Sequence, residues 1–300
     1  MDLNELEVLV AVAQERGFSR AAERLGRTQP AVSQAVRRLE DEIGALLFDR
    51  SVKDGTLTDA GRVLFAHAQQ MLNLRRDARV AIQELADLRS GKVLIAANEY
   101  TVTHVLPLVR RYRESHPRIK VEIRRSLASQ IPSELLGREV ELGLTTWRPG
   151  QPGLASVPVA TDDLALLVAP GHPLAGRAEV SIRELGRESF LAHNVRSPYR
   201  ERVIRTFERY RTPLQIVVEL PSLEAIKRLV EDGLGVALMP RRVAQAEIGR
   251  GGLMALTVRE MRFERTIHLV YRSGAALSHA ARAFVASARE RPPEEGLAVD

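Results

Sequence analysis

The segment SRAAERLGRTQPAVSQAVRRLE, which begins at Ser19 and ends at Glu40, constrains the fold more than any other part of the chain. Ser19 can cap a short first helix, and Gly26 is a natural stop for it. Either of the two residues before Pro30 can cap a second helix, because proline is favoured at the first helical position. Two short helices joined by a tight turn that contains a glycine are typical of a helix-turn-helix. The sequence therefore predicts this motif, with the second helix running through Glu40 toward Gly44.

The predicted second helix has one apolar face and one polar face. The apolar face is formed by Val32, Val36 and Leu39, which recur at helical spacing. The polar face carries Gln29, Ser33 and Arg37. Glutamine can make paired hydrogen bonds to adenine, serine can pair with several bases, and arginine can reach guanine or a phosphate. We therefore expect the apolar face to pack in a core and the polar face to read the edges of DNA bases.

The net charge of the chain is weak evidence for DNA binding. The formal net charge is +6, but residues 1–90 contain 13 Lys and Arg against 14 Asp and Glu. The charge near the predicted motif is more informative, because five arginines and a single acid, Glu23, lie between Arg20 and Arg38. Taken alone, this basic patch is typical of a solvated helical face, and it gains meaning from the motif that it surrounds.

A hairpin is expected just beyond the motif. Asp54-Gly55 is a strong turn signal between the apolar stretches LLFDR and GTLT. This pattern predicts the wing of a winged helix-turn-helix, with Arg50 and Lys53 placed to meet the phosphate backbone or the minor groove. Each of these two charges could equally belong to a solvated turn.

A long helix is expected from Asp59 to Arg89, with Thr58 as its cap. Its apolar seam repeats every seven residues, and the seam consists of Leu64, Met71, Ala78 and Leu85 with His67, Leu74, Ala81 and Leu88 between them. A helix of about 30 residues is about 45 Å long, too long for a small domain to cover. The seam is therefore predicted to pack on a second copy of the chain, although His67 and the alanines leave packing within one chain open.

From Gly91 onward, short apolar strands alternate with helices. Strands are expected at VLIAA, KVEI, ELGLTT, LALLVAP, FLAH, LQIVVEL, GVALMP and TIHLVYR, and helices at HVLPLVRRYRESH, SLEAIKRLVED and LSHAARAFVASARE. This alternation predicts a mostly parallel α/β sheet with helices on both faces. Ligands of such sheets bind beyond the carboxyl ends of the strands. The final RPPEEGLAVD is expected to be a disordered tail.

Several classes of function are disfavoured by the sequence. The chain has no cysteine, which excludes disulfides, thiolate nucleophiles and cysteine-type zinc sites. It has no GxSxG, phosphate-binding GxxxxGK[ST], HExxH or GxGxxG motif, so an enzyme is not expected, and neither catalytic residues, a metal nor a cofactor is predicted. No apolar run could span a bilayer and no signal peptide is evident, which predicts a cytoplasmic protein that does not contact membranes. A cytoplasmic solute-binding protein remains an alternative, but it would leave the first 90 residues without a role.

The sequence resembles the LysR-type transcriptional regulator family. The resemblance is carried by GFSRAAERLGRTQPAVSQAVRRLEDEIGALLFDR followed by LTDAG, and downstream by GKVLIAAN, LVRRYRESHPRIKVEI, VELGL, LVAPGHPLAG and LVEDGLGVALMP. It implies an all-α winged helix-turn-helix domain at 1–58, a linker and dimerisation helix at 59–90, and an α/β effector domain of the type 2 periplasmic-binding-protein kind at 91–291. The effector domain would comprise subdomain I, 91–161 with 267–291, and subdomain II, 162–266, followed by the tail at 292–300.

The resemblance also implies a mechanism. Members of this family form homotetramers from two linker-helix dimers, bind double-stranded promoter DNA at two sites, and relax the bend in the DNA when a small metabolite enters the cleft. The relaxed complex alters contact with RNA polymerase. A sequence-specific transcriptional regulator controlled by a small-molecule effector is therefore the expected function.

The family pattern places two groups of binding residues on this chain. The DNA contacts would be Gln29, Pro30, Ser33 and Gln34, together with Arg37 from the polar face and Arg50 and Lys53 from the wing. The effector contacts would be Thr101, Thr103, Ser126, Ser129, Thr145, Thr146, His193, Asn194 and Arg196. Hydroxyl groups and helix N-termini favour a carboxylate or another small anion, which Arg196 or Arg200 could pair with bidentately. These residues could instead be caps and surface arginines.

Overall fold

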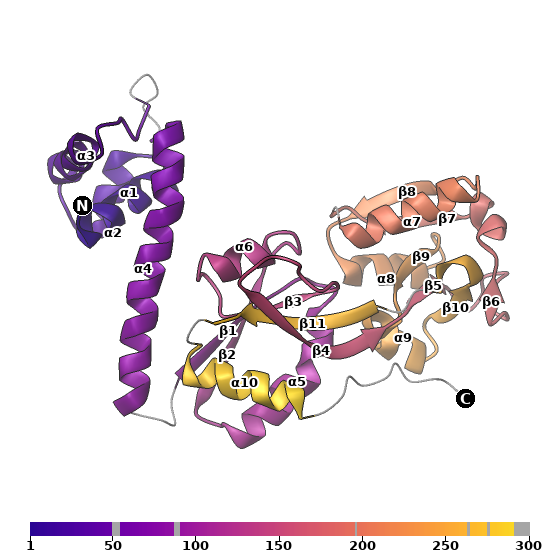
Figure 1. The fold of residues 1–300 in the computed structure, drawn as a ribbon. Coiled ribbons are helices and arrows are strands. Elements are labelled where there is room, and N and C mark those ends of the chain that lie inside the picture. Colours follow the sequence, from indigo (N-terminus) through magenta and orange to yellow (C-terminus); the bar gives the residue numbers. More distant parts are fainter. Residues whose placement is uncertain (50–54, 87–90, 196, 263–264, 275–276, 291–300) are drawn as a thin grey trace. The chain divides into compact units, whose positions relative to one another are not determined.

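The computed structural model describes residues 1–49, 55–86, 91–195, 197–262, 265–274 and 277–290 (Figure 1). The chain divides into two compact units, the first comprising Met1–Leu88 with Ser133–Val140 and the second Arg89–Pro132 with Glu141–Asp300. Within the described residues, every helix is too short or too polar to cross a membrane.

The first unit is built on four helices. They are α1 (Leu3–Glu15), α2 (Phe18–Leu25), α3 (Gln29–Ile43) and α4 (Asp59–Ala86). The hydroxyl of Thr28 accepts from the Ala31 N–H at 3.4 Å and caps α3, and Gly44 ends that helix in the left-handed conformation, both as predicted. The predicted Ser19 cap is wrong. Helix α2 already begins at Phe18, and the residue before it, Gly17, has no side chain to cap it.

The core of the first unit joins all four helices. Val32, Val36 and Leu39 of α3 are buried, as expected for its apolar face, against residues of α1, α2 and α4. The first turn of α4 lies close to the chain before the wing. A Cβ atom at Gly61 would stand 2.0 Å from the Leu47 carbonyl oxygen, so only glycine fits there.

The wing is a hairpin at its base. Phe48 and Leu57 form an antiparallel bridge, and the Asp49 N–H donates to the Thr56 carbonyl at 2.8 Å. Arg50 and Lys53, which were predicted as wing contacts, lie outside the described residues.

The second unit begins with a five-stranded sheet of order β2-β1-β3-β11-β4. Its strands are β1 (Gly91–Ala97), β2 (Ile119–Arg125), β3 (Leu142–Thr145), β4 (Leu154–Asp162) and β11 (Arg265–Arg272). Strands β1, β2 and β3 are parallel, whereas β11 runs antiparallel to both β3 and β4. Helices α5 (Val102–Ser115) and α10 (His279–Arg289) cover this sheet together, and the Tyr112 hydroxyl donates to the Ala280 carbonyl at 2.8 Å.

A second subdomain contains the remaining strands, in two sheets of order β6-β10-β5-β9 and β7-β8. Its strands are β5 (Leu164–Val168), β6 (Glu179–Val180), β7 (Ser189–His193), β8 (Gln215–Leu220), β9 (Ala237–Pro240) and β10 (Met254–Val258). The remaining helices of the chain are α6 (Ile131–Leu136), α7 (Pro198–Arg209), α8 (Leu223–Glu231) and α9 (Gln245–Gly249), with 3-10 turns at Ile182–Arg187, Arg241–Ala244 and Arg259–Met261. Figure 1 shows β4 and β11 running side by side between the two subdomains.

Every strand and helix predicted for this unit is present, but the predicted mostly parallel sheet is wrong. Antiparallel pairs join β11 to β3 and β4, and β5 to β9 and β10. Hydrophobic patterning indicates where a strand lies but not its direction. It therefore could not predict that β11 runs antiparallel to its neighbours. The unpredicted elements include β4, β10 and α7.

Candidate DNA-reading helix and ligand cleft

The polar face of α3 is open to solvent. Gln29, Pro30, Gln34 and Arg37 are exposed and Ser33 is half-buried, so the predicted reading residues share one accessible surface. The Gln29 side-chain amide donates to the Ser33 hydroxyl at 2.8 Å, which holds the two groups together on the free protein. Both groups retain further capacity for hydrogen bonds to bases.

The basic patch around α3 divides into two kinds of arginine. Arg20 donates to the Glu15 carbonyl at 2.6 Å at the end of α1, Arg24 pairs with Glu15 at 2.9 Å, and Arg38 pairs with Glu5 at 3.1 Å. Arg27 and Arg37 are exposed and form no ion pair within the described part of the chain. These two are therefore the positive charges most available to a phosphate backbone.

The seam of α4 is exposed from His67 to Ala78. Met71 and Leu74 have relative exposures of 39% and 51%, His67 and Ala78 are also exposed, and Leu64 is half-buried near α1. Large apolar side chains at heptad spacing on an exposed helix are typical of an interface with another copy.

The parallel strands bring the predicted effector residues to one edge of the first sheet. Thr101 and Ser126 follow the carboxyl ends of β1 and β2, Thr145 is the last residue of β3, and all three are buried. The Ser126 hydroxyl has no hydrogen-bond partner among the described residues. Thr101 and Thr145 are already engaged, since Thr101 bonds with Asn98 and Thr145 donates to the Trp147 carbonyl at 2.6 Å.

The other predicted effector residues vary in accessibility. Thr103 and Thr146 are half-buried, Ser129 and Asn194 are exposed, and Arg196 lies outside the described residues. Arg200 is engaged within the protein, where it donates to the His193 carbonyl and pairs with Glu219. A ligand would therefore have to displace these contacts in order to pair with Arg200.

Glu99 links the two subdomains and was missed from the sequence. It follows β1, and its carboxylate accepts from the Leu223 N–H at the start of α8 at 3.0 Å. The same carboxylate lies 3.3 Å from Nε2 of His193, at the end of β7. Nδ1 of His193 accepts from the Val195 N–H, which leaves Nε2 to donate. A carboxylate thus already occupies the N-terminus of α8, a place that favours anions.

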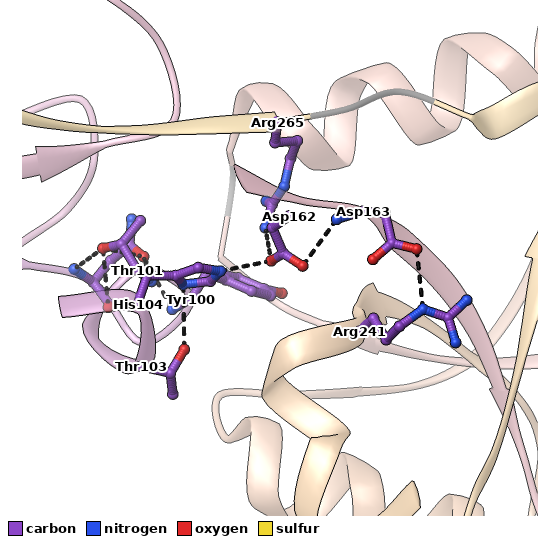
Figure 2. A network of polar contacts seen from close by, with 9 residues as sticks. Tyr100, Thr101, Thr103, His104, Asp162, Asp163, Arg241 and Arg265 are labelled. Atoms are coloured by element: carbon purple, nitrogen blue, oxygen red, sulfur yellow. Dashed lines mark hydrogen bonds and ion pairs between the residues drawn. The ribbon is translucent and has the colours of Figure 1, made fainter. Parts of the chain in front are cut away.

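A buried polar network lies where the chain crosses between the subdomains (Figure 2). Asp162 at the end of β4 accepts from Arg265 at the start of β11, and His104 of α5 contacts the same oxygen, with both distances 2.9 Å. The side chains of His104, Asp162 and Arg265 have relative exposures of 0%, 2% and 8%. Burial raises the pKa of Asp162, but the His104 hydrogen bond and the Arg265 charge outweigh it and hold that pKa below its usual value.

A winged helix-turn-helix with an open polar face, followed by a long helix and an α/β unit of two subdomains, is the architecture of a DNA-binding regulator. Comparison with known proteins agrees with this assignment. Residues 3–62 match the model of the bacterial regulatory helix-turn-helix protein, lysR family, and residues 86–293 match that of the LysR substrate binding domain.

Relatives match over nearly the whole chain. The RuBisCO operon transcriptional regulator of Allochromatium vinosum is 32% identical over 289 residues, which cover 95% of this chain and 94% of that protein. Among solved structures, full-length CbnR complexed with its target DNA has a TM-score of 0.71 at 22% identity, covering 97% of this chain and 99% of CbnR. A full-length OxyR variant from Pseudomonas aeruginosa has a TM-score of 0.70 at 25% identity, covering 96% and 95%. The chain belongs to the LysR family, and it is a DNA-binding transcriptional regulator rather than an enzyme.

Proposed function

We propose that this regulator acts in the cytoplasm, binds double-stranded promoter DNA through α3, and responds to a small-molecule effector held between its two subdomains. Gln29, Pro30, Ser33 and Gln34 read base edges and Arg37 contacts a base or phosphate, while Arg50 and Lys53 contact the backbone from the wing. The observation that carries this proposal is the open polar face of α3 above a fully buried apolar face.

Substitution of the reading residues should weaken specific binding. Gln29→Ala or Ser33→Ala is expected to cost about 1–3 kcal/mol at the specific site, because each removes hydrogen bonds to base edges. The measurement is fluorescence anisotropy with the region upstream of the protein's own gene, compared with unrelated DNA at two salt concentrations. Gln70→Ala on α4, an exposed glutamine away from α3, is the matched control.

The salt dependence separates base reading from backbone contact. Arg37→Ala at a phosphate contact lowers affinity for both DNAs and reduces the salt slope by about one unit, whereas the Gln29 and Ser33 variants leave that slope unchanged. Equal affinity of the wild-type protein for specific and unrelated DNA would contradict the proposed sequence-specific binding.

We also propose that the protein dimerises through α4 and that two dimers form a tetramer, which contacts RNA polymerase. The exposed seam around Met71 and Leu74 supports the first step. Leu74→Glu should dissociate the assembly into a species at most half the mass, because it places a charge in an apolar seam. Sedimentation velocity measures this, with Ala66→Glu on another exposed face of α4 as control. A Leu74→Glu variant that keeps the mass of the wild-type assembly would exclude this seam as the dimer interface.

The cleft location of the effector is supported by the three loops at the carboxyl ends of β1, β2 and β3. The buried Ser126 hydroxyl lacks a partner among the described residues, and the α8 N-terminus already holds the carboxylate of Glu99. An effector with an anionic or hydrogen-bond-accepting group suits this edge of the sheet.

We also propose the domain boundaries inferred from the sequence, with the DNA-binding domain ending near residue 58 and the effector domain beginning near residue 91.

A further inference from the structure

The loop after β1 presents two consecutive side chains to the second subdomain. Glu99 reaches the start of α8, and Tyr100 packs against the apolar cluster that contains Leu191 and Leu223. Because β1 belongs to the first subdomain, both contacts cross between the two subdomains. The loop therefore joins the subdomains at a second place, in addition to the chain crossing beside Asp162.

The loop is stiffened by one of its own side chains. The side-chain oxygen of Asn98 accepts from the N–H groups of Tyr100 and Thr101, both at 3.0 Å. The Asn98 carbonyl accepts from the Val102 N–H at 3.0 Å, where α5 begins. Such an Asx-turn fixes the backbone around position 99. The backbone of Glu99 is therefore already ordered, which lowers the entropic cost of its contact with α8.

The start of α8 offers Glu99 the donors that an anion would bind. The first N–H groups of a helix have no partner within the helix and carry partial positive charge. The Ser222 hydroxyl accepts one of them, the Ala225 N–H, at 3.3 Å. Oε1 of Glu99 accepts another, the Leu223 N–H, at 3.0 Å. Oε2 of Glu99 accepts from Nε2 of His193 at 3.3 Å, so each carboxylate oxygen has a donor from the second subdomain.

The His193 donor is itself fixed in place. Its Nδ1 accepts from the Val195 N–H at 3.3 Å, and its ring packs on Tyr100 with centroids 5.4 Å apart. Nε2 also lies 3.2 Å from the Pro221 carbonyl, so its proton is shared between that oxygen and Glu99. The side chain of His193 is 5% exposed. The donors therefore form a preformed niche of the second subdomain, and the carboxylate comes from the first.

We propose that Glu99 is an internal ligand, whose carboxylate occupies the niche formed by the Leu223 N–H and His193 and so holds the two subdomains together in the protein without an effector. The inference goes beyond the proposed function, since it concerns the unliganded protein and needs neither DNA nor a particular effector. A tethered carboxylate competes well for such a niche, because its effective concentration is at least millimolar. This side chain therefore shifts the equilibrium between the arrangements of the subdomains.

The test measures the distance between the subdomains in the full-length protein. The chain contains no cysteine, so Arg110→Cys on α5 and Glu208→Cys on α7 provide two exposed positions for spin labels. Labelled chains are diluted with unlabelled wild-type chains, so that double electron–electron resonance reports distances within one chain. Glu99→Ala is expected to lengthen or broaden this distance by more than about 2 Å. Hydrogen exchange at the Leu223 amide should accelerate at least about tenfold.

Chemical rescue separates an internal ligand from a side chain that only supports the local structure. Acetate has the size of the group that Glu99→Ala removes beyond Cβ. Millimolar acetate should therefore restore the wild-type distance and the slow exchange at Leu223 in this variant, whereas chloride at the same ionic strength should not. Acetate should leave the wild-type distance unchanged, because Glu99 already fills the niche.

Glu224→Ala is the matched control. Glu224 also lies in the first turn of α8, but it pairs with Lys227 and Arg228 inside the second subdomain. This variant should keep the wild-type distance. The proposal is overturned if Glu99→Ala keeps that distance, if Glu224→Ala lengthens it equally, or if acetate fails to restore it. DNA binding is measured separately by anisotropy, so these outcomes leave the DNA-reading function of α3 intact, whereas loss of that function would appear in the DNA titration alone.

Discussion

Asp162→Asn is expected to lower the free energy of unfolding of the second unit by about 3–5 kcal/mol, since removing one partner of a buried ion pair leaves the other charge uncompensated. Arg265 would keep its charge in a site where its side chain is only 8% exposed. Thermal and urea unfolding of the full-length protein, followed by circular dichroism, measure the loss.

The adjacent residue provides a matched control. Asp163 pairs with Arg241 at 3.0 Å, but its side chain is 52% exposed (Figure 2). Asp163→Asn should therefore cost no more than about 1 kcal/mol, as for other exposed pairs. Equal losses from Asp162→Asn and Asp163→Asn would contradict the assignment of a buried network.

The same network predicts a dependence of stability on acid. The pKa of Asp162 in the folded protein is held below its unfolded value by His104 and Arg265, despite burial. The contribution of the Asp162 carboxylate to the free energy of unfolding is therefore complete above its unfolded pKa of about 3.9. This contribution is lost as the pH falls through the lower pKa of the folded protein. The difference in stability between the wild type and Asp162→Asn should shrink below about pH 4.

Gly61→Ala should disrupt the first unit. The added Cβ would stand 2.0 Å from the Leu47 carbonyl oxygen, which belongs to the backbone and cannot rotate away. That carbonyl also accepts from the Thr58 N–H at 3.0 Å, so moving it costs a hydrogen bond as well. We expect a loss of at least about 3 kcal/mol, at the upper end of overpacking, together with loss of DNA binding.

Gly17→Ala serves as the control for Gly61→Ala. The added Cβ would meet only the flexible side chain of Arg20, at 3.4 Å, and Gly17 has an extended φ that other residues adopt. Its stability and DNA affinity should stay close to those of the wild type. Wild-type behaviour of Gly61→Ala would show that α4 can move away from Leu47 without penalty.

Local features of the sequence were sufficient to predict helix α3 and its two ends. The cap at Thr28, the stop at Gly44 and the buried stripe of α3 depend on residues within a few positions of one another, so they can be predicted from spacing alone. The Ser19 cap failed because helix α2 begins one residue before it, with Gly17 as its cap. Helix ends are the positions that spacing defines least well.

The polar contacts between the two subdomains depend on distant pairings. Asp162 and Arg265 lie 103 positions apart and meet because β11 pairs with β4. Hydrophobic patterning predicted β11 but neither its antiparallel direction nor β4. Glu99 gave no signal either, because a single acid after a strand resembles an exposed loop residue until α8 is placed beside it.

The paired strands β4 and β11 have a mechanical consequence. They are hydrogen-bonded to each other from Leu154–Arg272 to Asp162–Arg265, and the register shifts between Ile267 and His268. From His268 to Tyr271 strand β11 also pairs with β3, so only the stretch Arg265–Ile267 forms a two-stranded ribbon with β4. Such a ribbon resists stretching, because elongation breaks its hydrogen bonds, yet it twists readily, and an irregularity of this kind increases the local twist. We therefore expect the two subdomains to reorient by torsion about this ribbon rather than by moving apart.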